Sequence, residues 1–179
     1  PTTRGRPMVN LLPLAEGETI QTVLPLPEDE AEWAKLHVMF ATAKGSVRRN
    51  SMDAFTNIPS NGKIAMKFEG DDADERLIGV ALLTEEDDVL LASRQGKAIR
   101  FRGDDVREFQ SRNSTGVRGM TLRDGDEVIS LSILQRAGIK DTEEREEYLR
   151  FAPWKGEKEG TPNMTPERYE ELRSKEEFI

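Results

Sequence analysis

The chain has 179 residues, of which 36% are hydrophobic and 34% charged, and its formal net charge is −8. It has no cysteine, which excludes a disulfide framework and a thiolate metal site. No apolar run approaches the roughly 20 residues of a membrane helix, and no N-terminal stretch has the pattern of a signal peptide. We therefore expect a cytoplasmic protein and, because Pro1 and not methionine comes first, a piece of a longer one.

A pattern of about 50 residues occurs twice, and its last part also precedes the first copy. The partial copy is Gly5–Leu24, which resembles the stretch from Gly62 to Val80. The first full copy begins with Val38–Arg49, which has an apolar strand, a glycine-centred turn and a second strand that carries basic residues. The same twelve-residue pattern returns 51 residues later as Val89–Arg100. Each copy has the signature of a β-hairpin.

The second half of the unit repeats as well. Ser60–Met66 returns as Ser114–Met120, and Leu77–Val80 returns as Val128–Leu131. The spacing changes from 54 to 51 residues between these two matches, as expected when loops differ and strands do not. Repeats of this length with several short strands are typical of propeller blades, and the segments lack the 3.6-residue period of helical repeats.

The predicted fold class is therefore all-β, a partial β-propeller or β-pinwheel in residues 1–134. It would hold two four-stranded blades and part of a preceding one. A single sandwich with similar halves stays open as the alternative. Two blades and a part cannot close a ring, and closure is what removes exposed sheet edges in this architecture. We expect either a larger propeller around this chain or self-association through the open edges.

Residues 135–179 break the repeat pattern and predict a polar, mostly helical and partly mobile insertion. Asp141–Leu149 is a polar helical stretch where a third hairpin would begin. A second helix is expected to start at Thr165, because a capping threonine followed by Pro166 is a good helix start. This helix would continue through Tyr169 and Leu172, with Phe178 as its furthest extent.

The positive charge follows the repeat, although the chain as a whole is acidic. From Lys44 to Lys67 there are five basic residues and one acidic residue, and from Arg94 to Arg118 there are seven and three. Acidic clusters separate these segments. Because equivalent positions of successive blades lie on one circumference, the pattern predicts a basic track on one surface. Such a track neutralises phosphates and binds DNA without reading sequence. Basic side chains that only make strands soluble are the alternative.

Two motifs carry a family resemblance. Arg4–Leu14 closely resembles a segment early in the C-terminal domain of the bacterial gyrase A subunit, and Asn113–Met120 resembles the recurring blade motif of that domain. Leu77–Val80 and Ala92–Phe101 fit the same blades in the same order. The resemblance covers about residues 4–134. Its signature box, a Gln-Arg-Arg-Gly-Gly-Lys-Gly-like stretch, is absent from this chain.

The resemblance implies a six-bladed propeller whose basic rim wraps double-stranded DNA, so that bacterial, nucleoid-associated gyrase introduces negative supercoils. It implies a gyrase B subunit and a second A subunit as partners, with Mg²⁺, ATP and the strand-cleaving tyrosine on other domains. No cofactor, metal site or catalytic residue is expected in this chain. Ten basic residues are the candidates for DNA contacts: Lys44, Arg48, Arg49, Lys63, Arg94, Lys97, Arg100, Arg102, Arg112 and Arg118.

No active-site pattern stands out. His37 precedes a strand without a partner motif, so we expect it at the surface or a sheet edge. Tyr148 and Tyr169 are expected to be packing residues, and the acidic runs at 71–74 and 85–88 lack the spacing of a calcium loop. Two other functions stay open. One is a topoisomerase IV-type C-terminal DNA-binding domain, against which the Arg4–Leu14 segment weighs, and the other is a protein-interaction propeller.

Overall fold

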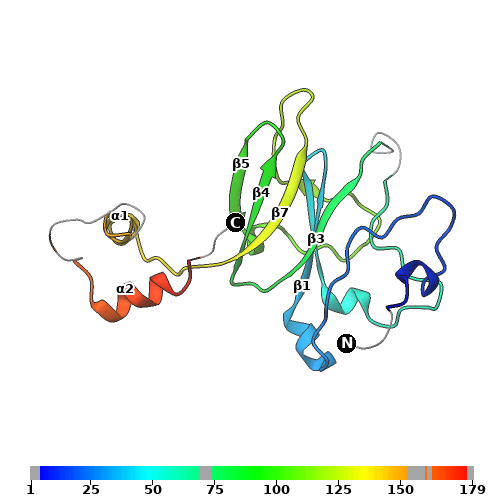
Figure 1. Ribbon diagram of the computed structural model, residues 1–179, viewed down its shortest axis with the longest axis horizontal. Helices are drawn as coiled ribbons and strands as arrows, with labels where there is room; N and C mark the ends of the chain where they lie inside the picture. The colour runs from blue at the N-terminus through cyan, green and yellow to red at the C-terminus, as the bar shows by residue number, and fades with distance from the viewer. Residues whose placement is uncertain (1–4, 69–73, 153–159, 161–162, 177–179) are drawn as a thin grey trace.

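The computed structural model describes residues 5–68, 74–152, 160 and 163–176, in which two antiparallel sheets pack face to face (Figure 1). The first sheet has the strand order β3 (Leu77–Leu83), β1 (His37–Thr42), β2 (Ser46–Ser51) and β6 (Val117–Arg118). The second has the order β5 (Ala98–Arg102), β4 (Asp87–Ser93) and β7 (Val128–Gln135). Short 3-10 helices lie at Met8–Asn10, Glu30–Lys35, Met52–Phe55 and Gly103–Asp105.

Each sheet is built on one of the predicted hairpins. β1 pairs with β2 around Gly45, and β4 pairs with β5 around Gly96. Both glycines have a positive φ, +89° and +82°, which glycine adopts without the steric cost that a Cβ atom brings. The glycine-centred turns predicted from the repeat therefore form in both units.

The first sheet is completed by a strand from the second unit. β6 pairs with β2 through Ser46 opposite Arg118 and Val47 opposite Val117. The close approach needs Gly116, whose φ is +108° and where an added Cβ would lie 2.1 Å from the Val47 carbonyl oxygen. The structure thus differs in detail from the predicted four-stranded blades. β6 belongs to the second unit by sequence but pairs in the first sheet, an arrangement we call the strand exchange, and the second sheet has three strands among the described residues.

The segment of the first unit that is equivalent to β6, residues 63–64, forms no strand, and neither do the described residues 5–36. The predicted part of a preceding blade is therefore not formed as strands. The reason is that residues 63–64 correspond to β6, so their pairing partner would be a strand of a preceding unit.

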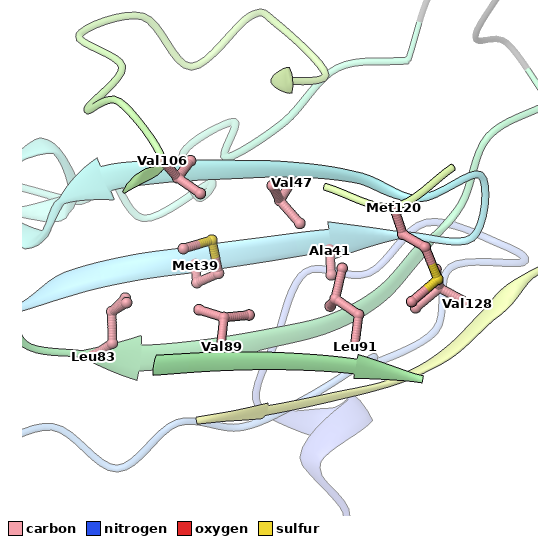
Figure 2. Close-up of a cluster of buried hydrophobic side chains, with 9 residues drawn as sticks. All are labelled: Met39, Ala41, Val47, Leu83, Val89, Leu91, Val106, Met120 and Val128. Carbon is pink, nitrogen blue, oxygen red and sulfur yellow. The ribbon is translucent and has the colours of Figure 1, made fainter. Parts of the chain in front are cut away.

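The main core lies between the two sheets. Figure 2 shows side chains of both sheets pointing toward one another, among them Met39, Val47, Val89 and Leu91, and all four are fully buried. A second core, of Val38, Phe40 and Met52, lies on the other face of the first sheet. Because side chains alternate between the faces of a strand, β1 is buried on both sides and has a continuous apolar sequence.

The helices α1 (Thr142–Arg150) and α2 (Pro166–Arg173) follow β7 and stand apart from the sheets (Figure 1). The rings of Tyr148 and Tyr169 pack 5.2 Å apart between them, as expected for packing residues. Arg168 donates to both carboxylate oxygens of Glu144, at 2.8 and 3.0 Å. These hydrogen bonds, with one from the Lys140 N–H, lower the pKa of Glu144 to about 2. Within the described residues, no helix is long and apolar enough to span a membrane.

The predicted start of the second helix is confirmed. The Thr165 side chain accepts a hydrogen bond from the Arg168 N–H, and Pro166 is the first helical residue. The helix ends at Arg173, and Phe178 lies outside the described residues. The division into blades at 1–134 and an insertion at 135–179 stays a prediction.

Candidate nucleic-acid interface

The two hairpin turns lie at the same end of the sheets. The Glu127 carboxylate joins the units by ion pairs, with Arg76 Nη2 at 2.6 Å and with the guanidinium of Arg94. The main chain joins them as well, because the N–H of Val128 donates to the carbonyl of Ala43 at 2.9 Å. Basic side chains on the two turns therefore share one surface.

Four of the ten predicted residues lie at this end and are exposed: Lys44, Arg94, Lys97 and Arg118. The side chain of Lys44 is 45% exposed and that of Arg94 66%. Arg118 pairs with Ser46, which directly follows the first turn. Lys97 directly precedes β5, and its ammonium group donates to the Thr121 carbonyl.

Two further basic residues at this end were not among the candidates, Arg76 and Arg123. Arg123 is exposed and lines an open hollow of about 290 Å³ together with Gln95, Gly96 and Lys97. The sequence pattern missed both because they lie in or beside the acidic loops, outside the two basic segments. Together with the four predicted residues they form what we call the turn-end surface.

Arg48 is a correction to the predicted set, because it is buried with 0% of its surface exposed. Its guanidinium donates to the carbonyls of Ala65, Arg112 (3.0 Å) and Ser114 (2.5 Å) and to Asn50 Oδ1 (2.9 Å). The charge also lies 4.9 Å from the centre of the Phe40 ring. Burial, and then the nearby Arg112, lower the pKa of Arg48 to about 10. A side chain that is buried and held in this way cannot reach a phosphate.

Arg49 is buried too, at 8% exposure, so it also leaves the set of surface candidates. Its Nε and Nη1 atoms have no hydrogen-bond partner among the described residues. His37 is likewise not the surface residue that the sequence predicted, because it is 8% exposed and its Nε2 lies 3.1 Å from a carboxylate oxygen of Glu108. The physical reason is the same for both: β1 and β2 are central strands with covered faces.

Arg100 and Arg102 lie on a different surface, the face of the second sheet that points away from the first. Arg100 Nη2 is 2.8 Å from Asp88 Oδ2, and Arg136 Nε is 3.0 Å from Asp88 Oδ1. Arg102 pairs with Asp104 at 2.5 Å, which raises the pKa of Arg102 and lowers that of Asp104. These arginines therefore belong to an ionic network and not to the turn-end surface.

Lys63 and Arg112 are half-buried in the loops that contact Arg48. Lys63 Nζ donates to the Thr56 carbonyl at 2.8 Å, and Arg112 Nη1 is buried without a hydrogen-bond partner among the described residues. The structure thus divides the ten candidates into four on the turn-end surface, two on the outer sheet face and four that are buried or half-buried. Within the described ranges, no group of acidic or histidine side chains could hold a metal ion. Residues 71–73 of the first acidic run lie outside those ranges.

Repeated hairpins, an exchanged strand and stacked four- and three-stranded sheets define a repeat protein of the β-propeller class. The model of the family described as "DNA gyrase C-terminal domain, beta-propeller" matches residues 36–83 and 87–135. The chain therefore belongs to that family. The predicted family and the predicted propeller class are both confirmed.

Relatives in several bacteria are DNA gyrase A subunits. The chain is 52% identical over 154 residues to the A subunit of Granulibacter bethesdensis gyrase, which covers 85% of this chain and 16% of the relative. It is 45% identical over 190 residues to that of Rickettsia bellii, covering 100% and 20%. For the Escherichia coli protein the identity is 46% over 130 residues, covering 73% and 14%. The chain thus spans a fifth or less of the length of these relatives.

Two solved structures share the fold. The C-terminal domain of DNA topoisomerase IV has a TM-score of 0.63 at 20% identity, covering 74% of this chain and 39% of that domain. The DNA gyrase A C-terminal domain has a TM-score of 0.60 at 23% identity, covering 74% and 41%.

Proposed function

We propose that this chain binds double-stranded DNA without reading its sequence, as a part of the gyrase A subunit. The exposed basic residues of the turn-end surface, which two neighbouring units present at one end, support this proposal most directly. A curved row of such surfaces around a larger propeller would bend DNA, since basic contacts follow the backbone and carry no base readout.

The ion pairs of this surface do not oppose DNA binding strongly. Lys44 pairs with Asp74, and Arg94 pairs with Glu127, but the side chains of both basic residues are well exposed. Ion pairs between exposed side chains contribute about 0–1 kcal/mol, so a phosphate can replace the carboxylate at small cost.

In the whole protein, this binding would wrap DNA and support ATP-dependent negative supercoiling. The partners would be the B subunit and a second A subunit, and the chemistry would take place on other domains. We also propose that the open edge of β5 makes the isolated chain self-associate. The match to the Rickettsia bellii relative covers 100% of this chain and the match to the Escherichia coli relative 73%, which supports an insertion that only some relatives carry.

The first test is binding of the chain to a labelled random-sequence duplex over a salt series. Phosphate contacts should give a log–log slope of about 0.9 per contact, and the sequence of the duplex should not matter. The triple variant Lys44→Glu, Arg94→Glu, Lys97→Glu should lower the slope by about 2.7 if each side chain meets one phosphate. The matched control is Arg145→Glu, which makes the same change of charge as each single substitution of the triple variant, at an exposed position of α1. Wild-type binding that ignores salt, or equal effects of the triple variant and the control per charge, would contradict the proposal.

A further inference from the structure

Each hairpin turn is held by a carboxylate from a loop far along the chain. In the first unit, Glu75 Oε2 accepts from the Thr42 hydroxyl at 2.9 Å, and Glu75 Oε1 accepts from the main-chain N–H of Lys44 at 2.9 Å. Glu75 Oε1 also accepts from the N–H of Arg76 at 3.1 Å. The Thr42 oxygen in turn accepts from the N–H of Ser46 at 3.0 Å, which closes the turn.

The second unit repeats these contacts at residues shifted by 51 positions. Asp126 accepts from the Ser93 hydroxyl at 2.7 Å and from the N–H groups of Gln95 at 3.0 Å and Glu127 at 2.9 Å. The Ser93 oxygen accepts from the N–H of Lys97 at 3.1 Å. We call each pair, Thr42 with Glu75 and Ser93 with Asp126, a turn clip.

Three of the four clip residues are buried, and Asp126 is half-buried. Thr42 is 0% exposed, Ser93 4% and Glu75 7%. Burial acts to raise the pKa of Asp126, but the hydrogen bonds from Ser93, Gln95 and Glu127 outweigh it and hold the pKa below its usual value. Buried polar groups keep their place when they are hydrogen-bonded, and a lost partner leaves the others unsatisfied.

The turns also have main-chain bonds to the same loops. The N–H of Ala43 donates to the carbonyl of Arg76 at 2.9 Å, and the N–H of Arg94 donates to the carbonyl of Glu127 at 2.8 Å. In each unit the turn and the acidic loop are therefore one hydrogen-bonded body. Lys44, Arg94 and Lys97 project from the backbone that the turn clips fix.

We propose that Thr42, Glu75, Ser93 and Asp126 are positioning residues for DNA binding, which fix the turns so that the basic side chains on them meet successive phosphates. This inference rests on the proposed function. It means that the carboxylates of Glu75 and Asp126 favour DNA binding by holding the turns, although their charge alone would repel DNA.

A role through charge alone and a role as a clip predict opposite changes in DNA affinity when Asp126 is replaced. If Asp126 acts only through its charge, Asp126→Asn removes a repulsion and strengthens DNA binding. If it acts as a clip, the amide nitrogen that replaces one oxygen cannot accept a hydrogen bond, the turn loosens, and binding weakens. Asp124→Asn is the matched control, because Asp124 is exposed in the same loop and lies outside the clip.

The experiment measures affinity and salt slope for the 179-residue chain on a random-sequence duplex, below the melting temperature of every variant. The double variant Thr42→Val, Ser93→Ala removes both hydroxyls without a change of charge. We expect a slope lower by about 0.9 for each phosphate that the variant no longer meets. Over a fourfold rise in salt, the affinity of the variant should then fall about 3.5-fold less for each such phosphate. Thr42→Ser and Ser93→Thr keep the hydroxyl and should restore the wild-type slope.

Circular dichroism and thermal melting show whether a variant is folded, and a merely structural role would change melting without changing the slope of the folded variants. A wild-type slope in the hydroxyl-free variant, or stronger binding by Asp126→Asn than by Asp124→Asn, overturns the turn clips as positioning residues and leaves the proposed function standing. Absence of salt-dependent binding by the wild type overturns both.

Discussion

The two repeat units share their hairpins and turn clips, yet their second strands are in opposite environments. β2 is a central strand covered on both faces, and its residues from Val47 to Asn50 are all buried. β5 occupies the same place in the second unit, but it is an edge strand and four of its five residues are exposed. The difference arises from neighbours and not from local sequence, because β6 covers the edge of β2 and no strand among the described residues covers that of β5.

Arg49 and Arg100 show this difference in environment at equivalent positions, because they are 51 positions apart on equivalent strands. Arg49 is 8% exposed on the face that meets the second sheet, whereas the side chain of Arg100 is 48% exposed and paired with Asp88. A basic residue at this place in the unit is therefore an interface residue wherever another sheet packs on it. Counting basic residues along the sequence cannot separate such positions from a DNA-binding surface.

The largest effect should come from Arg48, whose equivalent in the second unit is Ile99. Arg48→Met keeps an apolar chain of similar length but leaves three carbonyls and the Asn50 side chain without their donor. Unsatisfied buried groups cost about 1–3 kcal/mol each, but removing the guanidinium also relieves the cost of burying its charge, so we expect a net loss of about 3–5 kcal/mol in the free energy of unfolding. Ile99→Met conserves volume at a position that is 37% exposed and should cost less than about 1.5 kcal/mol.

Urea unfolding of both variants measures the two losses in the free energy of unfolding. Equal losses for Arg48→Met and Ile99→Met would mean that the buried guanidinium contributes no more than an edge residue, and that the units are energetically alike.

The sequence predicted the parts of the fold that local chemistry decides. The repeat spacing placed the hairpins, because a glycine with positive φ must stand at each turn, and the Thr165–Pro166 pair placed the start of α2. It could not place β6, because two residues pair with a strand about 70 positions earlier and carry no strand pattern of their own. The site was predicted in part: Lys44, Arg94, Lys97 and Arg118 are exposed at one end, while the burial of Arg48 depends on loops from both units. The turn clips left a signal in the sequence, since Glu75 and Asp126 are both acidic, and Thr42 and Ser93 both carry a hydroxyl, at the repeat spacing.

A smaller effect is expected at Gly116, whose equivalent in the first unit is Gly62. Both have positive φ, +108° and +85°, so alanine is strained at either position by about 1–2 kcal/mol. At Gly116 the added Cβ would also lie 2.1 Å from the Val47 carbonyl oxygen, whereas at Gly62 nothing lies within 4 Å. Gly116→Ala should therefore lose about 3 kcal/mol, because β6 must move away from β2, and Gly62→Ala only the strain. Thermal unfolding of the two variants compares them, and similar melting temperatures would show that the exchange of β6 is not a tight contact.

The smallest effect on the free energy of unfolding is expected for Arg49 and Arg100. Arg49→Met replaces a buried guanidinium, two of whose nitrogens have no hydrogen-bond partner among the described residues, by an apolar chain beside Met39. Since burying an unpaired polar group is unfavourable, the free energy of unfolding should stay within about 1 kcal/mol of the wild type or rise. Arg100→Met breaks a half-exposed ion pair with Asp88 and should lose up to about 1 kcal/mol.

Neither residue belongs to the turn-end surface, so DNA affinity should change less in both than in Arg94→Met, which removes the same charge. A loss of DNA affinity in Arg100→Met as large as that in Arg94→Met would place the outer face of the second sheet on the DNA path, and the separation of interface arginines from DNA-binding ones would then fail at this position.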